Sequence, residues 1–418
     1  MRNLFDQYKL PENRLTHALM TSLNEDRALL GKFIKWATGK QAPAPPSQLQ
    51  VLEQSLPGKE EPQDEEEHVG KGLPDGCIHD GKGWALLIES KITAPLNLRQ
   101  LRGHRRSAKA HNLTNPDLLA LVLKKPEHSE TEDENLKQWT ELYVWLKREK
   151  RQSEWVGRLI HYMEVLEARM LKNGDLKEGT LTVFTGIPFR KEHLYNYDEA
   201  KRIIRLAMEG LRSHKELCSE VGVDLERPPK AAIKGKEGNL VWDCFWPKEM
   251  DNWTAAPHLS VGIHRDYLNA VLIIPDKVAT RFRKRLRDVG LERFQAIVEE
   301  VLANFNSKLG KVAGAAPWCA VHQRHYRHQG AVPDVDAELQ FDLRTAFKGD
   351  ESAKIKPQTE WLRAAYDAFR CKSSNIQLEI GGRFLYEHCR DTNSPLILTH
   401  IADAWLACKP LIRTMGHD

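Results

Sequence analysis

The sequence predicts an α/β unit, with a mixed sheet flanked by helices, followed by a second, α+β domain. The chain has 418 residues, 41% of them hydrophobic, which is too long for one ordinary core. Residues 13–123 read in order as helix, hairpin, helix and strand, the pattern of an α/β unit. Strand patterns return after a Pro-, Gly- and Lys-rich stretch, so we expect domains at 1–225 and 241–418 with a linker at 226–240.

The first elements are a helical segment and an insertion. Residues 13–36 carry apolar side chains at helical spacing, and Asn24-Glu25-Asp26 is a point at which this helix can divide in two. Residues 40–68 are rich in Pro, Gln and Glu, and they bury too little apolar surface to offset the entropy of ordering. We therefore expect a mobile, acidic and Pro-rich insertion at 40–68.

A β-hairpin is predicted next. One strand covers residues 73–79, Asp80-Gly81-Lys82-Gly83 forms the turn, and a second strand covers 84–89. The second strand is almost continuously apolar, which is typical of a strand at the centre of a sheet. A helix at 95–110 and a short apolar strand at 117–123 follow.

The remaining elements follow from the same periodicities. Further helices are expected to cover the first sheet, and the second domain mixes strands with a basic helix starting near residue 276 and a C-terminal helix. The expected helices are 142–150, 155–170 and 197–221, with a strand at 180–184. The expected strands of the second domain include 259–263, 268–274, 337–343 and 376–380, the last leading into a hairpin at Gly381-Gly382.

Composition limits the classes of function. The formal net charge of +4 is too small to indicate a nucleic-acid partner by itself, so local clusters of cations matter more. Seven scattered cysteines without a CxxC pair favour neither a disulfide framework nor a zinc ribbon. The sequence shows no membrane-length apolar run, no secretory signal and no phosphate-binding loop, so we expect a cytoplasmic protein without membrane contact or an intrinsic ATP motor.

Three charged residues on the hairpin predict a metal site. Asp75 and Glu89 lie on the two arms of the hairpin. Lys91 is two residues after Glu89, so strand periodicity puts Glu89 and Lys91 on the same face. Magnesium prefers carboxylate oxygens and keeps several waters, so one carboxylate from each arm and the carbonyl of Ser90 make a sparse, open site. Such an ion polarises a phosphate and activates water, while the ammonium stabilises negative charge; phosphodiester hydrolysis is the reaction implied.

The sequence Pro74-Asp75 followed by Glu89-Ser90-Lys91 resembles the motif of the PD-(D/E)xK nuclease superfamily. The resemblance covers the N-terminal half of the chain and implies a restriction-endonuclease-like fold. It also implies Asp75 and Glu89 as ligands of Mg²⁺, with Mn²⁺ able to substitute, and Lys91 as the catalytic lysine. The alternative is that Asp75 is a turn residue and that Glu89 and Lys91 form a surface ion pair.

Two further positions resemble the same superfamily. Glu12 opens the first helix, which in many members approaches the metal, and Gln100-Leu101 is similar to the glutamine motif of RecB-like nucleases. The sequence departs from that branch at His104, where tyrosine is common. The alternatives are a carboxylate favoured by the helix N-terminus for Glu12 and an ordinary polar residue on a helix face for Gln100.

A basic ridge follows the predicted site. Residues 92–116 contain no acidic side chain, and four cations recur along one helical face: Arg99, Arg102, Arg106 and Lys109. We expect this ridge to contact nucleic-acid phosphates; the alternative is a solvated helix face.

Three segments of the second domain carry charged clusters. The basic cluster at residues 281–287 is more typical of a solvated helix face. Cys and His recur every three residues within 318–328, a spacing that does not readily surround a zinc ion, so a basic, aromatic loop or helix is expected there. Carboxylates alternate with apolar residues over 334–342, which predicts a strand whose carboxylates lie on its solvent-exposed face.

The sequence therefore predicts a metal-dependent DNA nuclease, and the resemblance makes a role in bacterial restriction or anti-phage defence an expectation. RNA as the substrate and a catalytically silent nucleic-acid- or protein-binding module are the alternatives. The second domain is expected to recognise the substrate or dock a partner, and a homo-oligomer or a defence-system partner stays open.

Overall fold

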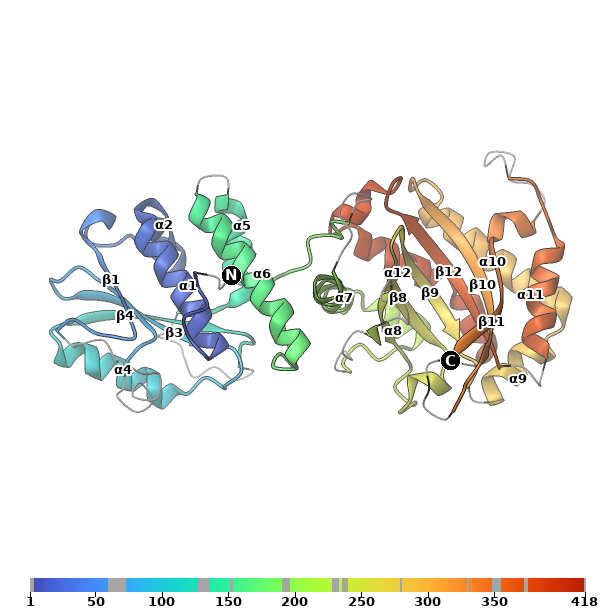
Figure 1. Ribbon diagram of the computed structural model, residues 1–418, viewed down its shortest axis with the longest axis horizontal. Coiled ribbons are helices and arrows are strands. Elements are labelled where there is room, and N and C mark those ends of the chain that lie inside the picture. Colours follow the sequence, from blue (N-terminus) through green and yellow to red (C-terminus); the bar gives the residue numbers. More distant parts are fainter. Residues whose placement is uncertain are drawn as a thin grey trace. The chain divides into compact units, whose positions relative to one another are not determined.

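The computed structural model is a mixed α/β protein with two compact units, Met1–Val183 and Phe184–Asp418 (Figure 1). The structure describes residues 4–58, 73–126, 135–150, 153–189, 196–227, 233–234, 240–278, 280–328, 331, 333–347, 355–371 and 375–416. In the described part of the chain, no helix combines the length and apolar character needed to cross a membrane.

The first unit is built on a five-stranded mixed sheet of order β1-β2-β3-β4-β5. β1 to β3 pair antiparallel, while β4 runs parallel to both β3 and β5. The strands are β1 Gln50–Glu53, β2 Gly76–His79, β3 Trp84–Lys91, β4 Asn115–Val122 and β5 Asn135–Gln138. The predicted hairpin is thus confirmed as β2–β3, and β3 lies at the centre of the sheet.

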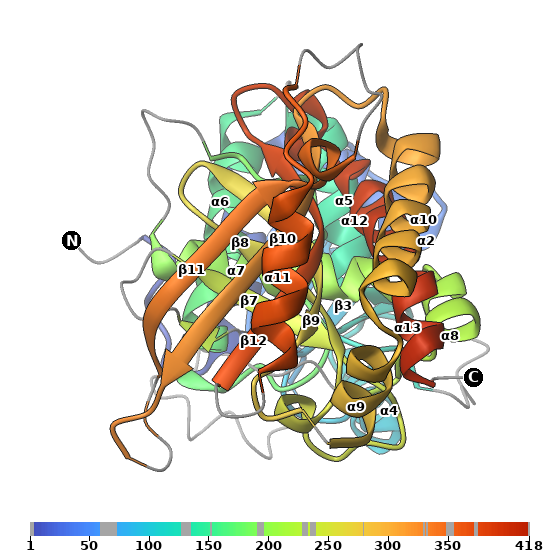
Figure 2. The same cartoon turned by 90° about the vertical axis from the view of Figure 1, so that its right-hand side faces the viewer.

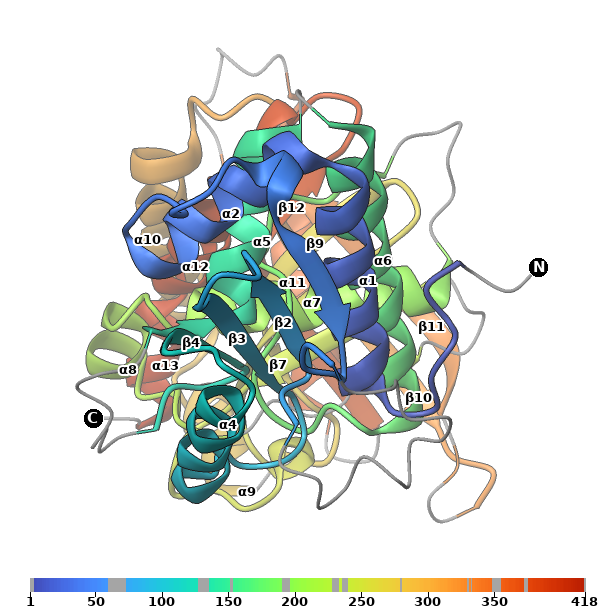
Figure 3. The ribbon, with the colours of Figure 1, turned by 90° about the vertical axis from the view of Figure 1, so that its left-hand side faces the viewer.

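Helices cover both faces of this sheet (Figure 3). Leu86 and Ile88 face a core shared with α1 Pro11–Glu25, α2 Arg27–Thr38, α5 Trp139–Glu149 and α6 Glu154–Asn173. Ala85 and Leu87 face the other way, against α4 Leu98–Ala110. This alternation explains why β3 reads as continuously apolar, since both of its faces are buried.

The helix predicted at 13–36 divides at Asp26. The Asp26 side chain accepts a hydrogen bond from the Leu29 amide at 2.9 Å, which caps α2. In the hairpin turn, Asp80 Oδ1 accepts from the amides of Lys82 (2.8 Å) and Trp84 (3.0 Å), and Gly83 supplies a φ of 119°. Contacts between residues close in the sequence therefore fix both the break between α1 and α2 and the hairpin turn.

Two predictions for the first unit are wrong. Residues 40–58 of the insertion expected at 40–68 are described by the structure and include the strand β1, which pairs with β2; residues 59–68 lie outside the described residues. No strand forms at 180–184, because the amides of Leu181 (2.6 Å) and Thr182 (3.2 Å) donate to the buried carboxylate of Glu167. A side chain thus satisfies the backbone groups that a strand partner would otherwise bind.

The second unit has a seven-stranded, antiparallel sheet of order β11-β10-β12-β9-β8-β7-β6, with β11 beside β10 at one edge (Figure 2). Its described helices share one core with the sheet. The strands are β6 Ile233–Lys234, β7 Val241–Phe245, β8 His258–Ile263, β9 Tyr267–Ile274, β10 Ala315–His325, β11 Asp334–Asp342 and β12 Asn375–Leu385. The helices are α7 Tyr197–Leu211, α8 Glu216–Val221, α9 Thr280–Asp288, α10 Leu291–Leu309, α11 Glu360–Arg370, α12 Ile397–Ala407 and α13 Lys409–Met415.

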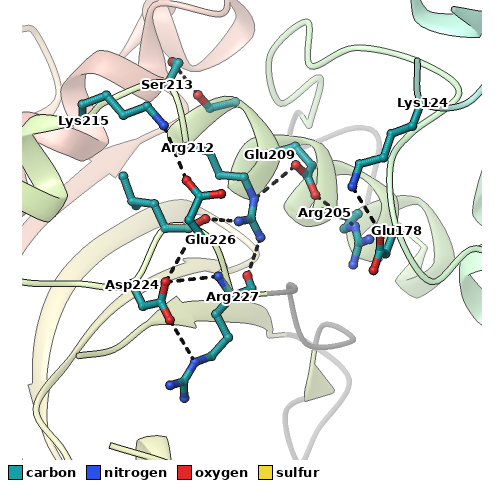
Figure 4. A network of polar contacts seen from close by, with 12 residues as sticks. Lys124, Glu178, Arg205, Glu209, Arg212, Ser213, Lys215, Asp224, Glu226 and Arg227 are labelled. Atoms are coloured by element: carbon teal, nitrogen blue, oxygen red, sulfur yellow. Dashed lines mark hydrogen bonds and ion pairs between the residues drawn. The ribbon is translucent and has the colours of Figure 1, made fainter. Parts of the chain in front are cut away.

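The boundary between the units lies earlier than the 226–240 linker we expected. The apolar side chains of α7, such as Ile203 and Ile204, pack in the core of the second unit. Arg212 binds the carbonyl of Leu225 and, at 2.7 Å, that of Arg227, so the chain after α8 is fastened to this unit (Figure 4). Within the expected linker, β6 pairs with β7.

Two further predictions for the second unit are also wrong. Residues 315–325 form the strand β10, not a basic loop or helix, while the expected strand at 334–342 is confirmed as β11. No hairpin forms at Gly381-Gly382, because β12 runs straight through both glycines. A Cβ on Gly382 would lie 2.8 Å from Phe305 Cε2 and 3.2 Å from the Ala404 Cβ, so glycine is needed for close helix packing, not for a turn.

We predict that Gly382→Ala destabilises the protein by about 1–3 kcal/mol through overpacking against α10 and α12. Gly103→Ala in α4 is the control, because nothing lies within 4 Å of its added methyl group. That control should be neutral or stabilising by about 0.5–1 kcal/mol. Urea denaturation measures both, and a Gly382→Ala protein as stable as the parent would contradict the packing.

Candidate active site

The predicted site forms where β2 and β3 separate. Their last paired residues are Gly76 and Ile88, and beyond this pair the Asp75 carboxylate accepts a hydrogen bond from the Ser90 amide at 2.7 Å. The Asp75 carbonyl accepts from the Gln54 amide at 3.1 Å, on the side of β1. Asp75 is therefore hydrogen-bonded to the end of β1 through its backbone and to β3 through its side chain.

Glu89 is a buried carboxylate that lies between the ammonium of Lys91 and the imidazole of His104. It is 1% exposed, its Oε1 lies 2.6 Å from the Lys91 ammonium, and its Oε2 lies 2.9 Å from Nε2 of His104. An ionised carboxylate only accepts hydrogen bonds, so Nε2 of His104 carries the proton. These contacts compensate a charge that would be costly to bury alone.

Lys91 keeps its charge in this setting. Burial by itself disfavours the ammonium, but Glu89, Asp75 and Glu12 outweigh burial and raise the pKa of Lys91 above its ordinary value. The side chain is 14% exposed, so it stays accessible from one side. At neutral pH the site therefore offers a fixed positive charge beside two acidic groups.

Glu12 acts on the backbone that follows β3. Its Oε1 accepts hydrogen bonds from the amides of Ile92 (2.8 Å), Thr93 (2.8 Å) and Ala94 (3.2 Å). Three converging amides suit one carboxylate oxygen, and they fix the turn directly after Lys91. These contacts give Glu12 a structural role, and its role as a metal ligand stays a prediction.

Gln100 and the ridge lie on α4. Gln100 is half-buried, one turn before His104 on the same helix face, and its side chain makes no hydrogen bond with any residue that the structure describes. The structure thus brings together Asp75, Glu89, Ser90, Lys91 and Glu12, while the role of Gln100 stays a prediction. The four ridge side chains are exposed and form no ion pair within the described residues: Arg99, Arg102, Arg106 and Lys109.

His104 is the site residue that sequence reasoning missed. Leu101, His104 and Ala108 form the buried stripe of α4, and His104 alone among them is polar. One feature of the sequence could have indicated its role: it is a histidine among the buried, apolar positions of the helix that follows Glu89-Ser90-Lys91. From the sequence, this histidine stands out only as a departure from the tyrosine of RecB-like nucleases.

The residues present fit a magnesium-type ion better than a zinc-type ion. Asp75 and Glu89 supply hard oxygen donors, and the described residues contain no group of three or more His, Cys, Asp or Glu side chains arranged to hold a metal. Magnesium is commonly bound through one or two carboxylates and keeps its waters, whereas structural zinc needs four protein ligands. The sequence around β10 supplies no such set, since Cys319 packs in the helix-covered core and His322, three residues along the strand, points to the other face.

No protein-family model and no curated protein matches this chain. What can be said of its chemistry therefore depends on the arrangement of its own residues.

We predict that Glu12→Ala destabilises the first unit by about 1–3 kcal/mol, because it leaves three amide donors without their acceptor. Amide hydrogen exchange in peptides covering residues 91–97 should accelerate. Glu25→Ala, at the exposed opposite end of α1, is the matched control and should leave exchange there unchanged. Unaltered exchange in the Glu12 variant would show that its contacts do not hold the turn.

Proposed function

We propose that the first unit is a metal-dependent nuclease of the PD-(D/E)xK type that hydrolyses phosphodiester bonds in DNA. The observation that carries the proposal is the meeting of Asp75, Glu89 and Lys91 at the open end of β2–β3, with His104 behind Glu89. A surface ion pair, the alternative, accounts poorly for a carboxylate that is 1% exposed.

We further propose that this unit has a restriction-endonuclease-like fold. In support, a helix precedes three antiparallel strands, and a helix then leads to a strand parallel to β3. The acidic residues and the lysine lie on the central hairpin of that sheet, as the resemblance implies. Fold likeness alone does not establish activity, so the proposal depends on the site.

The chain's own residues have distinct tasks in this reaction. Asp75 and Glu89 would hold the divalent ion, which when bound polarises the scissile phosphate and lowers the pKa of a coordinated water. Lys91 stabilises the extra negative charge on the phosphate as water adds, because its ammonium stays protonated at neutral pH. His104 is a positioning residue that orients Glu89, and Glu12 fixes the turn beyond Lys91.

The basic ridge is proposed to hold the substrate backbone. Its four cations are exposed, lie on one helix and have no carboxylate partner among the described residues. Such groups release counterions on binding phosphate and give affinity that falls with salt but depends little on sequence.

We predict that the wild-type protein cleaves DNA with Mg²⁺ or Mn²⁺ and that Asp75→Ala and Lys91→Ala each lower turnover by about 10²-fold or more. Lys91→Ala should still bind DNA, since it leaves the ridge intact. Lys82→Ala, in the exposed turn of the same hairpin, is the control and should cleave normally. The readout is gel analysis of labelled DNA and RNA in parallel.

The outcomes separate the candidate functions. Cleavage of RNA but not of DNA would show that RNA is the substrate. Tight binding without metal-dependent cleavage of either polymer would leave a binding module, and full activity in Lys91→Ala would remove the catalytic assignment.

We predict that the double variant Arg102→Ala/Arg106→Ala weakens DNA binding and reduces the slope of log affinity against log salt by about 0.9 for each phosphate that the variant no longer neutralises. Arg281→Ala/Lys284→Ala removes two exposed cations from the basic helix α9 and serves as the matched control. Fluorescence anisotropy across a salt series measures both. An equal loss of affinity in the two variants would contradict a specific role for α4.

A further inference from the structure

The sheet of the second unit has two unlike faces. Along β12, Leu378 and Ile380 point into the helix-covered core, whereas Gln377, Glu379 and Arg383 point to the opposite face. The same alternation holds on β10, where Val321 is in the core and His322 is not. An antiparallel sheet often has one solvated face, but such a face usually carries exposed, mutually satisfied polar groups.

This opposite face is hollowed into a cavity of about 380 Å³, within the size range of small-molecule sites. Its lining mixes rings, imidazoles and charges drawn from β7 to β12 and from the short helix Trp253–Ala255. The residues that give the cavity its chemical character are Trp242, Trp253, His258, His322, Glu379 and Arg383.

Several buried polar atoms in this cavity lack a hydrogen-bond partner within the described residues. His258 is 2% exposed, and its Nδ1 contacts the Ala256 carbonyl at 3.0 Å while its Nε2 has no partner. Nε of Arg383 and Nε of Arg324 are buried and unpartnered as well. Buried polar groups are unfavourable when they are left unsatisfied, so their gathering in one cavity points to a polar ligand.

The cavity also has aromatic walls. The rings of Trp242 and Trp253 meet edge to face with centroids 5.1 Å apart. The Arg383 guanidinium lies 4.4 Å from the Tyr267 ring centroid and 3.7 Å from that of Trp318, and its Nη2 donates to Gln340 at 2.7 Å. Ring surfaces beside a fixed guanidinium suit a flat ligand whose edge carries hydrogen-bonding groups.

The charges of the cavity are nearly balanced. Glu379 and Glu338 lie 3.5 Å and 3.4 Å from the two ring nitrogens of His322, and two arginines offset these acids. Burial lowers the pKa of His258 to about 4, so it is a neutral ring at physiological pH, with one donor and one acceptor. A balanced set of donors and acceptors favours an uncharged ligand over a phosphate or another strong anion.

We propose that this cavity binds a single nucleobase, stacked on the tryptophan wall and read at its edge by Glu379, Arg383 and His258. Nucleobases are flat and uncharged and carry donors and acceptors on one edge, and proteins that bind extruded bases use stacking with edge contacts. The choice of a nucleobase over another neutral ring rests on the proposed nuclease function. The base comes either from a nucleic-acid strand or from a free nucleoside.

Calorimetry on the full-length protein in EDTA tests the proposal with two sets of probes: the four deoxynucleosides, and short single- and double-stranded DNA containing each base. We expect saturable binding of at least one probe. Trp242→Ala should weaken it about tenfold, because the base then loses one of the two tryptophan rings of the wall on which it stacks. Glu379→Gln keeps the side-chain shape and should weaken binding of the same probe by a similar factor. Trp361→Ala, at an exposed tryptophan of α11 outside the cavity, is the control and should bind normally.

Binding of free nucleosides that both cavity variants weaken supports the proposal, with a soluble ligand as the source. The same sensitivity seen only with oligonucleotides supports it with an extruded base as the source. Absence of any binding that both variants weaken overturns it. Because EDTA removes cleavage from the measurement, a failed nuclease assay and a failed cavity assay are separate results.

Discussion

The first unit depends on how the charge of Glu89 is buried. A carboxylate at 1% exposure is unfavourable unless opposite charge and hydrogen-bond donors surround it. Lys91 provides the charge from the same strand, and His104 provides a donor from α4. The need to satisfy Glu89 therefore couples the register of β3 to the packing of α4.

Local patterns predicted the centre of this unit. The apolar run ending at Ile88 indicated a central strand, and period-two geometry predicted that Glu89 and Lys91 share a face. The Asp80 turn and the Asp26 cap are signals within four residues of the atoms they bind. Such features are readable because their partners are close in the sequence.

Features that depend on partners distant in the sequence could not be predicted from local patterns. β1 lies in a polar, Pro-rich context, and its strand conformation comes from pairing with β2. The apolar stripe of α7 predicts a helix but not which sheet it covers, so the domain boundary was misplaced. Gly381-Gly382 reads as a turn because nothing local shows that α10 and α12 press against the strand there.

The link between Glu12 and the Ile92 amide spans 80 positions of the chain. During synthesis the N-terminal helix emerges long before the backbone that its carboxylate binds, and His104 emerges later still. The turn after Lys91 therefore gains its Glu12 contacts only after residues 12 and 92–94 have both been synthesised. The contacts around Glu89 are complete only when the nascent chain has extended past α4.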